Sequence, residues 1–147
     1  PIGGDLEIYK ACRDQIKEGV ESIIPFIEQQ SMTKTIDRKT TIAIGADHGG
    51  VELKESLKGH LKAKGIVVQD YGPACDQACD YPDFAKAVGR SVASGQHRLG
   101  VLICKTGIGM SMAANKISGA RAALVTDVET ASKTTRKNFR EKIKAKN

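Results

Sequence analysis

The chain has 147 residues, 40% of them apolar, which supports one globular domain with an appendage rather than two full-sized domains. No stretch approaches the roughly 20 uninterrupted apolar residues that span a bilayer, so we expect no membrane segment and predict a cytoplasmic protein. The net charge of +6 lies in residues 133–147, and a basic tail on a neutral body with 4% aromatic residues argues against nucleic-acid binding.

The N-terminal part is predicted to be a helical extension. Apolar residues between positions 5 and 30 recur at mostly helical spacing, and Pro25 is expected to break or bend the last part. The polar stretch over residues 29–40 is predicted to be a linker. We therefore divide the chain into a helical extension with its linker, residues 1–38, and an α/β domain, residues 39–147, which ends in a basic helix.

From Thr41 onward, short runs rich in branched apolar residues alternate with helical patterns. The predicted strands are residues 41–45, 66–70, 99–104 and 121–125. The predicted helices lie near residues 51–64, 84–94 and 110–117, closed by Gly65, Gly95 and Gly119, and a last helix begins at about Val128. This alternation predicts a three-layer Rossmann-like α/β sandwich with a parallel sheet of about four strands. Ligands of such folds bind beyond the carboxyl ends of the strands.

The strongest motif is CKTGIGMS at residues 104–111, which leaves a predicted strand, passes two glycines and opens a helix. Glycine permits close approach of the backbone, and a helix N-terminus adds N–H donors and positive potential, so the motif predicts a phosphate or oxyanion cradle. It matches neither glycine-rich nucleotide fingerprint. The same potential favours a reactive thiolate at Cys104, and the alternative is a buried cysteine at the end of a strand.

Two further motifs fall at the same predicted edge of the sheet. Asp47 and His48 follow the first strand, where they can orient hydroxyls and contact a phosphate. The alternative is that Asp47 caps the next helix beside a solvated histidine. The segment Asp80-Tyr81-Pro82-Asp83 suits the start of a helix, from which Tyr81 can reach a sugar hydroxyl.

The cysteines and histidines predict no metal centre. The three histidines show no ligand spacing, and Cys75-x3-Cys79 stands without a second pair. The four cysteines are scattered and are expected to be reduced thiols.

Taken together, the motifs IAIGADHGG, DYPDFA and GVLICKTGIGMSMAANK, followed by GARAALVTD, resemble type B ribose-5-phosphate isomerases and related galactose-6-phosphate isomerase subunits. The resemblance covers about residues 41–132. It implies interconversion of ribose 5-phosphate and ribulose 5-phosphate through an enediolate, with no metal or organic cofactor. Proteins of this family are dimers, so the resemblance also implies a homodimer that binds a small sugar phosphate.

The resemblance implies roles for individual residues as well. Cys104 would be the base that moves a proton between C1 and C2 of the sugar, and Thr106 would assist proton movement between the oxygens. The backbone of residues 106–111 would hold the oxyanion. The implied substrate contacts are Asp47, His48, Tyr81, Lys105, Gly107, Ile108, Gly109, Ser111 and Asn138.

The sequence departs from the family pattern at three places. Lys105 replaces a glycine, and a lysine would be strained there if the position required positive φ. Lys137 replaces the histidine that opens the furanose ring, and a fifth strand with an arginine-bearing helix is not found. Two alternatives therefore stay open, a catalytically impaired sugar-phosphate-binding domain and a galactose-6-phosphate isomerase-type subunit. A basic-tail scaffold for nucleic acid is the weakest hypothesis.

Overall fold

In the computed structural model of the chain, the structure describes residues 41–73 and 79–134 and six N-terminal helical positions, Lys10, Ala11, Asp14, Gln15, Glu18 and Glu21. The chain divides into two units, residues 1–36 with 125–147, and residues 37–124. The predicted boundary after residue 38 lies near the first division, and a second division follows Leu124 inside the predicted α/β domain. In the described part, no helix is long and apolar enough to cross a membrane.

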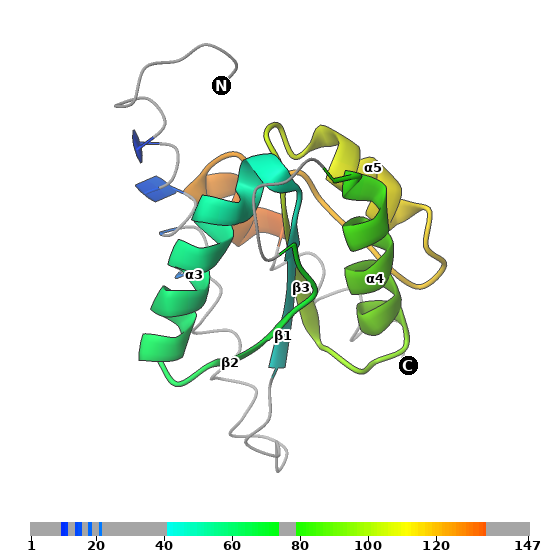
Figure 1. The fold of residues 1–147 in the computed structure, drawn as a ribbon, viewed down its shortest axis with the longest axis horizontal. Helices are drawn as coiled ribbons and strands as arrows, with labels where there is room; N and C mark the ends of the chain where they lie inside the picture. Colours follow the sequence, from blue (N-terminus) through cyan, green and yellow to red (C-terminus); the bar gives the residue numbers. More distant parts are fainter. Residues whose placement is uncertain are drawn as a thin grey trace. The chain divides into compact units, whose positions relative to one another are not determined.

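The unit of residues 37–124 is a three-layer α/β fold around a parallel sheet (Figure 1). Helix α3 lies on one side of the sheet, and helices α4 and α5 lie on the other (Figure 1). The elements in chain order are β1 (Thr41–Ala46), the 3-10 turn η1 (His48–Gly50), α3 (Val51–Ala63), β2 (Val67–Asp70), α4 (Tyr81–Ala93), β3 (Leu99–Ile103) and α5 (Ile108–Asn115). The predicted fold class is confirmed.

The middle strand of the sheet is β1, because the strand order is β2-β1-β3. Ile42 pairs with Val68 on one side and with Leu99 on the other. Ile42, Ala43 and Ile44 are buried because helices cover both faces, which explains the continuous apolar run in this strand. The order reverses between β1 and β3, and a doubly wound sheet opens a binding crevice at such a point.

The helix boundaries follow local chemistry. Gly65 and Gly95 have φ values of +75° and +79°, and each directly follows the C-cap residue of its helix, so these two predicted helix-ending glycines are confirmed. Gly119 has a φ of +85° but lies three residues beyond Lys116, the C-cap of α5, so it does not end that helix. Helix α4 begins at Tyr81, three residues before the predicted start. Pro82 permits this earlier start, because proline in the first helical turn forfeits no hydrogen bond.

The structure corrects the prediction of a fourth strand. Residues 121–125 are all described and belong to no strand, so the described sheet has three strands rather than about four. The polar backbone groups of Ala122 pair with a side chain instead of a neighbouring strand. Asn115 Nδ2 donates to the Ala122 carbonyl at 2.8 Å, and Asn115 Oδ1 accepts from the Ala122 N–H at 2.9 Å. The amide of Asn115 therefore takes the role of a strand partner.

In the other unit, residues 128–134 are helical, as the sequence predicts. Asp127 caps this helix by accepting the Thr130 N–H at 2.8 Å. The same backbone hydrogen bond holds the pKa of Asp127 below its ordinary value. The predicted N-terminal helix is helical at its six described positions, and the rest of it lies outside the described residues.

Candidate active site

The loop after β3 places the sulfur of Cys104 at the start of a helix. Strand β3 ends at Ile103, and α5 begins at Ile108 after Gly107, whose φ is +75°. This left-handed conformation, which favours glycine, turns the Gly107 N–H back toward the strand. That N–H donates to Cys104 Sγ at 3.0 Å. The sulfur therefore accepts a backbone hydrogen bond from the residue that precedes the first turn of α5.

The donors of the predicted cradle are divided among several acceptors. The Gly107 N–H is bound to sulfur, and the Ser111 N–H donates to the Gly107 carbonyl at 3.0 Å. The Ile108 N–H makes a 3.4 Å contact with Thr106 Oγ1. Because the first N–H groups of a helix have no intrahelical partner, those of Gly109 and Met110 are the donors best placed for an anion.

The loop after β1 lies beside this cradle. The Asp47 N–H donates to the Ile103 carbonyl at 3.0 Å, which joins the carboxyl ends of the two strands. A Cβ placed on Gly50 would lie only 2.8 Å from the Ile103 carbonyl oxygen, so glycine is required for this approach. The two motifs that follow β1 and β3 are therefore adjacent at one edge of the sheet.

Asp47 carries a polar atom that lacks a partner. Asp47 as a residue is 9% exposed, and its Oδ1 makes no hydrogen bond among the described residues. Asp47 occupies the position before η1 without a side-chain capping bond, so capping does not explain this carboxylate. His48 is exposed at the same loop. A buried carboxylate oxygen with no partner is the arrangement expected where a ligand hydroxyl completes the hydrogen bonding.

Tyr81 approaches the cradle from the start of α4. A Cβ placed on Gly109 would lie 2.8 Å from Tyr81 Cζ and 3.1 Å from its hydroxyl oxygen, so the ring packs directly on the Gly109 backbone. Asp80 precedes the helix in extended conformation and makes no side-chain capping bond. The three predicted motifs thus meet, with Tyr81 on α4, Cys104 after β3 and Asp47 after β1.

Lys105 lies at the mouth of the cradle without backbone strain. Among the described residues, no residue other than glycine has positive φ, so the strain considered for a lysine at this position is absent. The left-handed residue of the loop is Gly107 instead. Lys105 is exposed, and its Cβ would lie 3.7 Å from a Cβ placed on Gly49. Its side chain therefore starts beside the Asp47 loop.

The remaining predicted groups divide into two sets. Cys79 and Cys104 are free thiols. Cys12, Cys75, Lys137 and Asn138 lie outside the described residues. Within the described part, no group of three histidine, cysteine, aspartate or glutamate side chains is arranged to hold a metal ion.

Two contacts that support the site are not indicated by any motif in the sequence. A Cβ placed on Gly107 would lie 2.5 Å from Leu124 Cδ1, so Leu124 packs against the turn that bonds the sulfur. Asn115 in turn holds the backbone two residues before Leu124. The second contact is Lys54, which is buried in the apolar face of α3. A lysine at helical spacing with Leu57 and Leu61 is the only sequence signal for it.

The chain is an α/β protein in which a free thiol, a glycine-containing turn and the start of a helix lie together at the carboxyl edge of a parallel sheet. The model of the family described as Ribose/Galactose Isomerase matches residues 42–141, which is more than half of the chain. The chain therefore belongs to the ribose/galactose isomerase family.

Individual relatives agree with this membership. The chain is 48% identical over 90 residues to galactose-6-phosphate isomerase subunit LacB of Clostridium acetobutylicum, covering 61% of this chain and 52% of that protein. It is 43% identical over 86 residues to ribose-5-phosphate isomerase B of Escherichia coli, covering 58% of each chain. The chain thus spans between about half and three-fifths of the length of these two relatives.

A solved structure shows the same fold. Ribose-5-phosphate isomerase B from Mycoplasma genitalium, with bound ribulose-5-phosphate, superposes with a TM-score of 0.58 at 46% identity, covering 61% of this chain and 60% of that one.

Proposed function

We propose that this chain interconverts ribose 5-phosphate and ribulose 5-phosphate through an enediolate, with Cys104 as the base. The observation that carries the proposal is the 3.0 Å hydrogen bond from the Gly107 N–H to Cys104 Sγ at the start of α5. It is supported by the partnerless Asp47 Oδ1 beside that loop. Family membership supports sugar-phosphate isomerase chemistry in general.

In the proposed reaction, the Cys104 thiolate removes the proton from C2 of the open-chain aldose. The C–H electron pair forms the C1–C2 double bond, and the negative charge moves to O1. The N–H groups at the start of α5 stabilise this oxyanion, because preorganised donors cost no reorganisation when charge develops. The thiol then returns the proton to C1, and Thr106 assists transfer of the O2 proton to O1.

The proposed substrate contacts extend this arrangement. Asp47 binds a sugar hydroxyl with its partnerless oxygen, His48 contacts the phosphate, and Tyr81 lines the pocket above Gly109. The other proposed contacts are Lys105, Gly107, Ile108, Ser111 and Asn138. A homodimer is also proposed, supported by the exposed apolar side chains of Ile108 and Met112 on α5. The cytoplasmic location stays a prediction.

The assigned base is tested by replacing Cys104 with alanine. We expect Cys104→Ala to lower kcat for ribose 5-phosphate by about 10²- to 10⁴-fold, the usual contribution of a general base, measured by NMR of aldose–ketose interconversion. The matched control is Cys79→Ser, which alters the other described free thiol and should keep the wild-type rate. Equal turnover by wild type and Cys104→Ala would show that Cys104 is not the base.

The second candidate is a domain of the same fold that binds sugar phosphates without converting them. The exposed lysine at the cradle mouth, where the family pattern has glycine, is the observation that favours it. This candidate predicts that ribose 5-phosphate raises the Tm of wild type and of Cys104→Ala equally, without turnover. It also predicts that turnover appears in Lys105→Gly. Turnover by the wild-type chain would exclude it.

The galactose-6-phosphate isomerase-type alternative concerns the substrate rather than the chemistry. The similarity to the LacB subunit favours it. It predicts a higher kcat/KM for galactose 6-phosphate than for ribose 5-phosphate when both sugars are assayed with the same preparation. The reverse order of the two values would support the pentose phosphate.

A further inference from the structure

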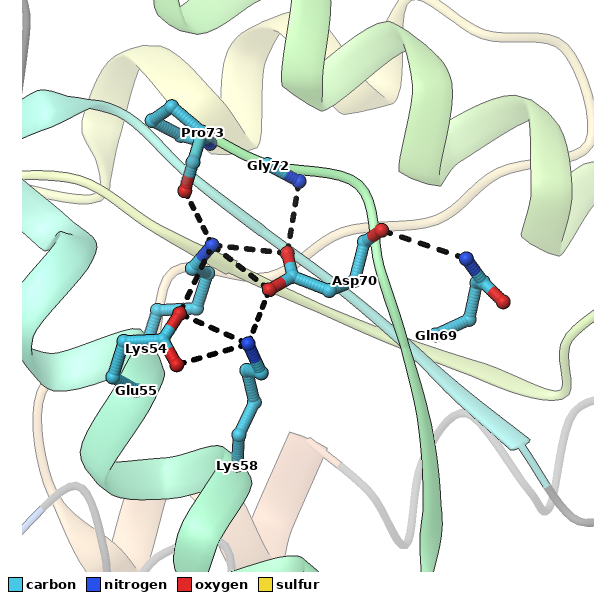
Figure 2. Close-up of polar contacts among 7 residues, drawn as sticks. All are labelled: Lys54, Glu55, Lys58, Gln69, Asp70, Gly72 and Pro73. Carbon is cyan, nitrogen blue, oxygen red and sulfur yellow. Dashed lines mark hydrogen bonds and ion pairs between the residues drawn. The ribbon is translucent and has the colours of Figure 1, made fainter. Parts of the chain in front are cut away.

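Helix α3 buries the side chain of Lys54 against the sheet. The Lys54 side chain has no exposed surface, yet its Nζ lies 3.0 Å from both carboxylate oxygens of Asp70, the last residue of β2. Nζ also donates to the Pro73 carbonyl, as Figure 2 shows. A buried ammonium is costly unless all its donors are paired, so these contacts fix the turn that follows β2.

Asp70 also holds the turn that follows β2. Its Oδ1 accepts the Gly72 N–H at 2.8 Å, and its Oδ2 accepts from Lys58 (Figure 2). Lys58 also pairs with Glu55 at 2.9 Å at the partly exposed rim of the cluster. Lys54 donates both to the Asp70 carboxylate and to the Pro73 carbonyl. Lys58 donates to the Asp70 carboxylate but not to Pro73, so only Lys54 ties the carboxylate to the turn after β2.

The fixed turn touches two parts of the candidate active site. The Gly72 carbonyl accepts the Ala46 N–H at 3.0 Å, one residue before Asp47. A Cβ placed on Gly72 would lie 3.2 Å from Phe84 Cε1, so the turn packs against the first turn of α4. That helical turn begins at Tyr81, whose ring lies on Gly109.

We propose that Lys54 and Asp70 are positioning residues that set the placement of Tyr81 and Asp47 against the anion cradle. This inference rests on the proposed isomerase function. Neither residue touches the cradle, and both act through Gly72, which contacts the strand before Asp47 and the helix that carries Tyr81. A displacement of about 1 Å at a positioned group can cost about 10²-fold in rate.

The test separates positioning from stability. A buried ion pair can often be replaced by apolar residues of similar volume without loss of stability, so Lys54→Met/Asp70→Leu removes the fixation while filling the space. The single variant Lys54→Met leaves Asp70 hydrogen-bonded to Lys58 and Gly72. If the double variant does not fold, the same measurements are made on Lys54→Met. Lys58→Met is the matched control, because it removes a lysine from Asp70 without removing the Pro73 contact.

We expect kcat/KM for ribose 5-phosphate, measured well below each Tm, to fall by about ten- to a hundredfold in the Lys54 variants, and by less than about threefold in Lys58→Met. Amide hydrogen exchange over residues 79–84 should accelerate in the same variants. Wild-type kcat/KM and exchange in a folded Lys54 variant would overturn the proposal. If wild type shows no turnover, the isomerase function fails, and unchanged exchange over residues 79–84 still overturns the positioning role.

Discussion

The glycines around Cys104 are required for different reasons. Gly107 needs its left-handed φ to bring its N–H to the sulfur, whereas Gly109 needs the absence of a side chain, because the Tyr81 ring occupies that space. Both requirements fall within one turn of α5. A substitution at Gly109 can therefore disturb the proposed catalysis by moving the Tyr81 ring, without disturbing the turn whose N–H group donates to the sulfur.

Gly109→Ala tests this distinction. The new Cβ would lie 2.8 Å from Tyr81 Cζ, so the ring must move, and we expect kcat/KM for ribose 5-phosphate to fall at least about tenfold. Gly59→Ala is the control, since a Cβ there meets nothing within 4 Å in the interior of α3. The control should keep the wild-type rate and gain about 0.5–1 kcal/mol of stability. Equal rates in both variants would contradict the proposed place of Tyr81.

At the scale of elements, α3 and β2 are joined by charges whose pKa values the fold perturbs. Burial acts to raise the pKa of Asp70, but hydrogen bonds from Lys58, the Gly72 N–H and Lys54 outweigh it and set this pKa below the ordinary value of 3.8. The hydrogen bonds that Lys58 donates to Asp70 and Glu55 raise the pKa of Lys58 above its ordinary value of 10.5. Both shifts favour the charged forms in the folded chain.

The lowered pKa of Asp70 has a direct consequence for acid stability. Its contribution to the free energy of unfolding is fully present above about pH 4, its ordinary titration range, and is lost as the pH falls through the lower folded value. We expect urea denaturation between pH 6 and pH 2 to show a steeper acid loss in wild type than in Asp70→Asn. Parallel curves for the two proteins would show that Asp70 does not contribute.

Sequence reasoning located the elements that carry periodic patterns but not the contacts between them. The carboxyl ends of parallel strands gather at one edge, so the meeting of the motifs at Asp47 and Cys104 could be predicted from strand positions. The burial of Lys54 could not, because lysine is almost always exposed unless a partner distant in sequence pairs with it. The strand predicted at residues 121–125 failed for a similar reason, since Asn115 supplies the partner for Ala122.

At the scale of the whole molecule, exposed apolar side chains bear on the proposed homodimer. Ile108 and Met112 lie one helical turn apart on α5 and are 53% and 62% exposed. Exposed apolar patches are typical of protein interfaces, although single exposed residues are common. Both residues belong to the helix whose first turn forms the predicted cradle, so an interface there would place a second copy near the candidate active site.

Met112→Lys tests the interface. We expect wild type to sediment as a dimer at about 10–50 μM, and Met112→Lys to shift toward monomer, because burying an unpaired charge at an interface costs several kcal/mol. Val67→Lys is the control, since Val67 is 50% exposed on β2, away from α5. Dimers that persist in Met112→Lys, or dissociate equally in Val67→Lys, would exclude the α5 surface.

The central place of β1 also sets when the site can be completed during synthesis. Ile42 pairs with Leu99, which lies 57 residues further along the chain, and the Asp47 N–H donates a hydrogen bond to the Ile103 carbonyl. A nascent chain that has released β1, α3 and β2 from the ribosome therefore still lacks one side of its middle strand. The loop that carries Cys104 is translated directly after β3, so the described three-stranded sheet and the candidate active site can be completed only at the same stage of synthesis.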